Sequence, residues 1–178
     1  DRTATFTISA EGQESITVTL VQKKYVAPTG ATTTDELTAE STGVKGLTGK
    51  SYLDWTISDG FSVSYAGNSM PGQDYLQIRS SNSNSGIVST TSGGKVRKVV
   101  IAWNAATTDK TRKLSVYGSN SAYTSAAELY DNEKRGTKLG DIALGETTLE
   151  IEGDYQYIGL RSNSGAIYLD KIEITWEN

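Results

Sequence analysis

Short runs of alternating apolar and polar residues, separated by glycine and small polar residues, recur along this sequence of 178 residues. The runs are rich in β-branched residues, and the 18 Gly lie between them, which is typical of a many-stranded antiparallel fold. One helical turn is predicted, at Ser125 to Asp131. The pattern predicts an all-β protein, an antiparallel sandwich of the jelly-roll or galactose-binding-like type, with strands at 61–66, 74–80, 86–91, 95–103, 112–118, 137–144, 147–152, 155–162 and 166–176.

The N-terminal region has a different organisation. Alternation over 1–22, interrupted by a turn at Gly12, predicts a β-hairpin, and 23–34, with Pro28, Gly30 and a run of threonines, predicts a linker. The sandwich is expected over 35–178. Because an isolated hairpin is marginally stable in water, this one is expected to pack on the main domain, to pair with another chain, or to belong to a further domain.

Composition excludes several classes of function. The net charge is −4, and no Lys/Arg stretch is dense enough to neutralise a run of phosphates, so nucleic acid is an unfavourable partner. The chain has no His and no Cys, which removes disulfides, thiolate zinc sites, thiol nucleophiles and the commonest general base. No apolar run reaches the roughly 20 residues that span a bilayer. The first residue is Asp1, and we expect any signal peptide or anchor upstream of it.

Two segments look like an internal duplication, each a strand, a polar turn and a strand. They begin with YLQIRS at 75–80 and YIGLRS at 157–162. Alternation turns the aliphatic residues of both segments to one face, which we expect to be core, and Tyr and Arg to the other. The expected core residues are Leu76, Ile78, Val99, Ile101, Ile158, Leu160, Ile172 and Ile174.

Several stretches of the sequence also resemble two known protein families. TATFTISA at 3–10 and ITVTLVQ at 16–22 resemble the last two strands of a BACON domain, a small sandwich common in gut-bacterial surface proteins. YLQIRS, YIGLRS, VVIAWN at 99–104 and GAIYLDKIEITW at 165–176 resemble a jelly-roll domain of Bacteroidetes-type surface lipoproteins. The resemblance implies an extracellular, outer-surface or periplasmic location, neighbouring modules in one polypeptide, and carbohydrate binding.

The candidate ligand-binding residues are on the two duplicated strands. Tyrosine rings stack on the apolar face of a sugar ring, and arginine offers a planar fork of donors to hydroxyls. We also expect Gly159 to leave room for a sugar ring. The alternative is that these side chains occupy ordinary solvated strand faces, or that the arginines bind loop carbonyls or Asp and Glu side chains. The candidates are Tyr75, Arg79, Tyr155, Tyr157 and Arg161.

Acidic residues suggest two weaker hypotheses. Glu150, Glu152 and Asp154 project from one strand face at a spacing that suits the two carboxyl groups of a glycosidase, but a solvated strand shows the same pattern. The likeness to glycan-binding jelly rolls implies a structural calcium ion with Asp170 as a ligand. The candidates for further calcium ligands, from the start of the domain, are Asp35, Glu36 and Glu40. The alternative leaves Asp170 at the surface or paired with Lys171 or Arg161.

The three tryptophans are mostly expected in the core. Trp103 and Trp176 continue apolar alternations, whereas Trp55 lies in a loop-rich stretch where a binding role stays open. Together these features predict a non-catalytic, carbohydrate-binding module of an exported surface protein. The alternative is a structural spacer or protein-interaction domain, and an enzyme is a more distant alternative.

Overall fold

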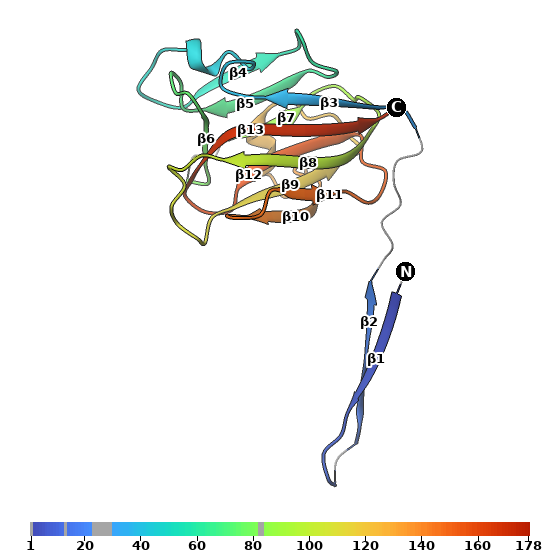
Figure 1. Ribbon diagram of the computed structural model, residues 1–178. Helices are drawn as coiled ribbons and strands as arrows, with labels where there is room; N and C mark the ends of the chain where they lie inside the picture. Colours follow the sequence, from blue (N-terminus) through green and yellow to red (C-terminus); the bar gives the residue numbers. More distant parts are fainter. Residues whose placement is uncertain (1, 13, 23–29, 82–83) are drawn as a thin grey trace.

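Two antiparallel sheets pack face to face in the computed structural model, which describes residues 2–12, 14–22, 30–81 and 84–178 (Figure 1). The six-stranded sheet has the order β10-β9-β12-β7-β5-β4, and the other has the order β11-β8-β13-β3, with β6 also paired to β13. The predicted antiparallel β-sandwich with an N-terminal hairpin is therefore confirmed. No helix among the described residues is long and apolar enough to cross a membrane.

Most strands lie close to the predicted ranges. The six-stranded sheet consists of β4 (Leu53–Ile57), β5 (Tyr65–Ser69), β7 (Gly86–Ser89), β9 (Lys113–Ser119), β10 (Thr137–Ala143) and β12 (Tyr157–Ser162). The other sheet consists of β3 (Thr32–Leu37), β6 (Leu76–Arg79), β8 (Lys95–Trp103), β11 (Thr148–Glu150) and β13 (Ala166–Glu177). Two 3-10 helices, η1 (Val44–Gly46) and η2 (Ala126–Tyr130), complete the sandwich, and η2 lies in the predicted helical turn.

Two strands of the sandwich, β3 and β4, were not predicted, and β3 begins before the expected start of the domain at residue 35. β3 pairs with the end of β13, with Thr32 opposite Glu177, so 32–34 are strand rather than linker. The predicted linker residues 23–29 lie outside the described residues. Because β3 and β13 are neighbours, the first and last strands of the sandwich lie side by side, as the calcium hypothesis required.

Alternation correctly predicted the core. All eight residues expected there are at most 2% exposed. Strand β6 belongs to one sheet and β12 to the other, so the aliphatic residues of the two similar segments face one another between the sheets. Their Tyr and Arg side chains consequently lie on opposite outer surfaces of the sandwich.

A buried hydrogen-bond network joins the two sheets. Asp35 on β3 is 4% exposed, and its two carboxylate oxygens accept hydrogen bonds from the Ser62 N–H at 2.7 Å and the Tyr65 hydroxyl at 2.8 Å. The indole N–H of Trp176 on β13 donates to the same hydroxyl at 3.2 Å. Asp35, named above as a candidate for a further calcium ligand, is thus bonded through both oxygens within the protein.

The hairpin of β1 (Arg2–Ile8) and β2 (Ile16–Gln22) has one apolar face that stays uncovered. The register places Phe6 opposite Val18 and Ile8 opposite Ile16, while the other face carries threonines and Val21. Phe6 is 46% and Ile16 64% exposed, and Figure 1 shows the hairpin apart from the sandwich. The described structure therefore gives no support to packing of the hairpin on the main domain.

Removal of 1–29 is expected to leave the stability of the sandwich almost unchanged. The hairpin buries almost no apolar side chain, so its loss removes little hydrophobic stabilisation. We expect the melting temperature of the remaining chain to change by less than about 2 °C in calorimetry, which corresponds to less than about 1 kcal/mol. A decrease of about 5 °C or more would mean that the hairpin packs on the sandwich in solution.

Candidate functional site

The candidate site is a group of tyrosine and polar side chains on the outer face of β6 and β13. Leu76 and Ile78 of β6 point into the core, so Gln77 and Arg79 point outward, and Gln77 lies opposite Tyr168 of β13. Tyr75 precedes β6, and Tyr52 comes from the segment before β4. We call these five residues the tyrosine patch: Tyr52, Tyr75, Gln77, Arg79 and Tyr168.

Direct contacts organise the tyrosine patch. The rings of Tyr75 and Tyr168 meet edge to face, with centroids 5.2 Å apart and planes at 85°. The amide of Gln77 donates a hydrogen bond of 2.9 Å to the Tyr52 hydroxyl. The Arg79 guanidinium carbon lies 6.0 Å from the centroid of the Tyr52 ring, a cation–π distance. Partial burial raises the pKa of Tyr52 to about 12, so this phenol is protonated at neutral pH and keeps its donor.

The patch retains groups that can bind a ligand. All three tyrosines are only partly buried, and Arg79 is exposed. The Arg79 Nε donates to the Ser81 hydroxyl at 2.6 Å, and the Arg79 side chain also forms a hydrogen bond with the Tyr52 hydroxyl. The arrangement thus combines aromatic rings with an amide, phenol hydroxyls and an exposed guanidinium, the chemistry that binds sugar rings and their hydroxyls.

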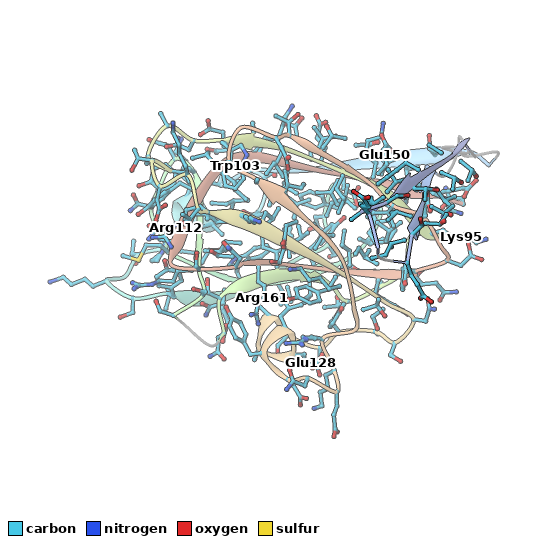
Figure 2. The ribbon with its side chains drawn as sticks, turned by 90° about the horizontal axis from the view of Figure 1, so that it is seen from below. Lys95, Trp103, Arg112, Glu128, Glu150 and Arg161 are labelled. Carbon is cyan, nitrogen blue, oxygen red and sulfur yellow. The ribbon has the colours of Figure 1, made fainter. Side chains whose placement is uncertain are left out.

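Tyr157 and Arg161 have a different environment on the outer face of the six-stranded sheet. Tyr157 packs against a second apolar cluster that includes Tyr123 and Leu129. Arg161 donates from Nη1 to the Leu129 carbonyl at 2.8 Å, and its guanidinium carbon lies 4.5 Å from the centroid of the Tyr130 ring. Figure 2 shows Arg161 beside η2, the helix that carries Glu128. Arg161 therefore holds η2 to the sheet. This contact matches the alternative given above, in which the arginine binds a backbone carbonyl.

The space expected over Gly159 is occupied. A methyl group at Gly159 would overlap the side chain of Leu129, and Tyr123 also lies in contact range. A sugar ring cannot approach the backbone there, so this expectation was wrong. Sequence alternation placed Gly159 on the outer face correctly, but it could not show that η2 covers that face. A ligand role for Tyr157 and Arg161 stays a prediction.

Tyr155 lies apart from the pair Tyr75 and Arg79 and from the pair Tyr157 and Arg161. Its ring lies over Gly118 and packs against the main core, and it lines a cavity of about 470 Å³ together with Glu150 and Glu152. Glu150 forms an ion pair with Lys98 at 3.2 Å, and both glutamates are exposed rather than buried. A glycosidase general acid needs an environment that keeps a carboxyl group protonated, and exposed glutamates lack such burial.

Asp170 is exposed and accepts a hydrogen bond of 2.6 Å from the Asn104 amide. Lys171 forms its ion pairs with Glu36 and Glu173 instead of Asp170. No group of three or more acidic side chains that would suit a metal ion occurs in the part of the chain that the structure describes. This placement adds no support for a calcium site at Asp170, which stays a prediction.

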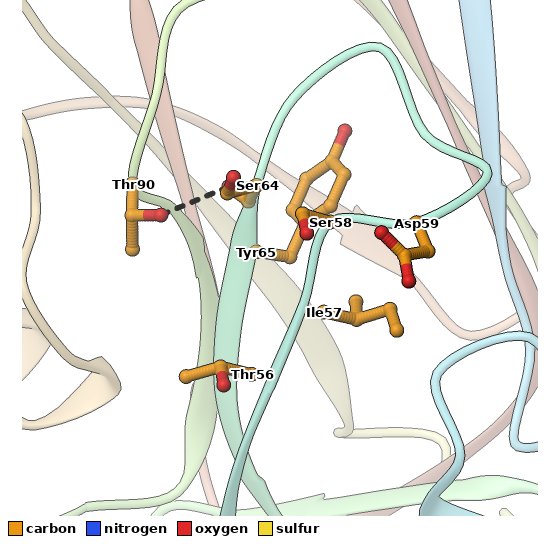
Figure 3. Close-up of a pocket in the computed structure, with 7 residues that line it drawn as sticks. All are labelled: Thr56, Ile57, Ser58, Asp59, Ser64, Tyr65 and Thr90. Atoms are coloured by element: carbon orange, nitrogen blue, oxygen red, sulfur yellow. Dashed lines mark hydrogen bonds between the residues drawn. The ribbon is translucent and has the colours of Figure 1, made fainter.

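A second cavity, of about 360 Å³, lies between β4, β5 and the end of β7 (Figure 3). Hydroxyl groups line it, and Thr90 donates to the Ser64 carbonyl at 3.2 Å. Its one aromatic side chain, Tyr65, is fully buried with its hydroxyl bonded to Asp35. Without an accessible ring, this cavity is a weaker sugar site than the tyrosine patch.

The tryptophans lie mostly where packing was expected. Trp176 is fully buried, Trp103 is partly buried against the core, and Trp55 is 7% exposed with its indole directly over Gly67. The binding role left open for Trp55 has no support from this position. Sequence reasoning did not identify Tyr52, which lies in an irregular stretch, or the role of Tyr168, although alternation along β13 gives Tyr168 an outward direction.

The fold and the tyrosine patch define a β-sandwich module with an aromatic and polar surface on one sheet. No family model, curated protein sequence or solved structure matches this chain.

Proposed function

We propose that this protein is a non-catalytic carbohydrate-binding module of an exported bacterial surface protein. The observation that carries the proposal is the tyrosine patch, in which three partly exposed rings lie around an amide and an exposed guanidinium on one strand pair. Sugars present both apolar ring faces and hydroxyl pairs, and this surface offers partners for both. The likeness to glycan-binding jelly rolls and BACON-containing surface proteins supports the same ligand class and an extracellular location.

The proposal is tested by a glycan-array screen of the whole chain, followed by calorimetric titration with the glycan that binds. We expect Tyr168→Ala to weaken binding about ten-fold, because one ring worth roughly 1.4 kcal/mol is lost. Arg79→Lys is expected to weaken binding as well, since an ammonium group cannot reproduce the bidentate fork.

Tyr157→Ala is the matched comparison, because Tyr157 is a partly buried tyrosine on the opposite sheet. We expect its affinity to stay within about two-fold of wild type, after a thermal melt has shown that all variants fold. Loss of binding in Tyr157→Ala, with Tyr168→Ala unchanged, would move the site to the other sheet. Absence of any binding glycan would contradict the proposal.

A structural spacer or protein-interaction domain is the second candidate, and the hairpin favours it. Its apolar face, which includes Phe6, Ile8 and Leu20, is 46–58% exposed at these residues, and such a surface is typical of sites that contact another protein surface. In this alternative the tyrosine patch binds no sugar, and the hairpin packs against a further module. The glycan screen separates the two functions.

A further inference from the structure

The cavity at Tyr155 lies where the two sheets meet at an open edge. Strand β10 ends the six-stranded sheet and β11 ends the other, and both contribute to the lining. From β10 come Lys138 and Leu139, and from β11 and the loop after it come Glu150, Glu152 and Tyr155. The volume of about 470 Å³ lies in the range of small-ligand sites.

The loop that carries Glu152 and Tyr155 is fixed to β8. The Ile151 N–H donates to the Arg97 carbonyl and the Val96 N–H donates to the Tyr155 carbonyl, both at 2.8 Å. The Arg97 side chain donates from Nη1 to the Gly153 carbonyl at 2.6 Å and from Nε to Glu177 at 2.5 Å. These bonds hold both ends and the middle of the loop, so the cavity is formed before any ligand arrives.

The charged groups of the cavity differ in how they are paired. Lys138 forms an ion pair of 2.9 Å with Asp141, and Glu150 forms one of 3.2 Å with Lys98. Glu152 is exposed and has no partner among the described residues. The cavity therefore offers one free carboxylate beside a tyrosine ring and an apolar Leu139 side chain, with a lysine ammonium at the same site.

We infer that this cavity is a second saccharide-binding site, selective for neutral sugars. The Tyr155 ring and Leu139 provide apolar contact for a sugar ring, and the Glu152 carboxylate accepts hydrogen bonds from adjacent hydroxyls. With the ion-pair partners Asp141 and Lys98 counted, three carboxylates lie against two ammonium groups, and the resulting net negative charge disfavours uronic acids and other acidic sugars. The inference shares its ligand class with the proposed function but rests on a different edge of the sandwich.

The test is amide NMR of the uniformly 15N-labelled whole chain, titrated separately with cellohexaose, mannohexaose, xylohexaose and hexagalacturonate. We expect at least one neutral hexasaccharide to shift amides at 137–139 and 150–155, and hexagalacturonate to leave them unchanged. Glu152→Gln is expected to weaken this binding at least about five-fold. The control is Glu40→Gln, because Glu40 is also an exposed glutamate but does not line the cavity, and this variant is expected to leave the binding unchanged. Tyr155→Phe keeps the ring and is expected to bind within about two-fold of wild type.

The outcomes are distinct from those of the tyrosine patch. Shifts at Gln77, Arg79 and Tyr168 alone would support the proposed function and overturn the second site. Shifts at the cavity alone, lost in Glu152→Gln, would support the second site and contradict the tyrosine patch. No cavity shift with any neutral hexasaccharide, or an equal response to hexagalacturonate, would overturn the inference.

Discussion

Ile174→Ala is expected to lower the free energy of unfolding by about 2–5 kcal/mol, the range for truncating a buried aliphatic side chain that leaves a cavity. Ile174 is fully buried on β13, between Val99 of β8 and Asp35 of β3 in the register. β13 is the central strand that pairs with β3, β6 and β8, so the surrounding side chains have little freedom to fill the space. Urea unfolding at neutral pH measures the change from the shift in midpoint.

Glu173→Ala is the matched control for this prediction. Glu173 is the preceding residue on the same strand, points outward, and forms a partly exposed ion pair of 2.8 Å with Lys171. Surface ion pairs contribute about 0–1 kcal/mol, so the control is expected to change stability by no more than that. Similar changes in both variants would mean that the inward and outward faces of β13 have been assigned wrongly.

The strands of this fold could be predicted wherever one face of a strand is regularly apolar. β8 and β13 have that pattern and were predicted to within one residue of their observed ends. β5 does not, because its sequence YAGNS offers few apolar side chains, yet all five of its residues are buried. Trp55 from β4 supplies the missing apolar volume over Gly67, a contact between strands that neither strand's own sequence reveals.

The candidate site could be predicted only in part, for a related reason. Alternation gave Tyr75 and Arg79 an outward direction, but Tyr52 joins them through a fold-dependent contact from an irregular segment. The same alternation gave Tyr157 and Arg161 an outward direction, and there η2 covers the surface. The alternation of a strand determines whether a side chain points inward or outward. Which residues cover that side chain depends on distant parts of the chain.

Stability is expected to fall steeply at alkaline pH because of two buried tyrosines. Tyr65 is fully buried and Tyr123 is 2% exposed. Burial raises the pKa of both phenols well above the ordinary value, with the nearby Asp35 carboxylate adding to the effect at Tyr65 and Glu128 at Tyr123. In the unfolded chain both phenols ionise near pH 10, so the unfolded state loses its protons first as pH rises.

Proton linkage determines the direction in which the free energy of unfolding changes with pH. Below about pH 10 both states keep their phenol protons, and the contribution of the two tyrosines to stability is fully present. Above it Tyr65 and Tyr123 keep up to two more protons in the folded state than in the unfolded state, so these two residues lower the free energy of unfolding by as much as about 2.7 kcal/mol per pH unit. Urea midpoints measured at about pH 9, 10 and 11 test this, and we expect most of the decrease between the last two.

Tyr65→Phe provides the control, because it removes one of the two titrating groups. The variant is expected to be less stable at neutral pH, since Asp35 and the Trp176 indole lose their hydrogen-bond partner. Its stability should nevertheless fall less steeply above about pH 10 than that of wild type, by up to roughly 1.4 kcal/mol per pH unit. An equal slope in the two proteins would contradict the contribution of Tyr65 and assign the alkaline loss to other groups, such as the lysines of ion pairs like Lys171–Glu173.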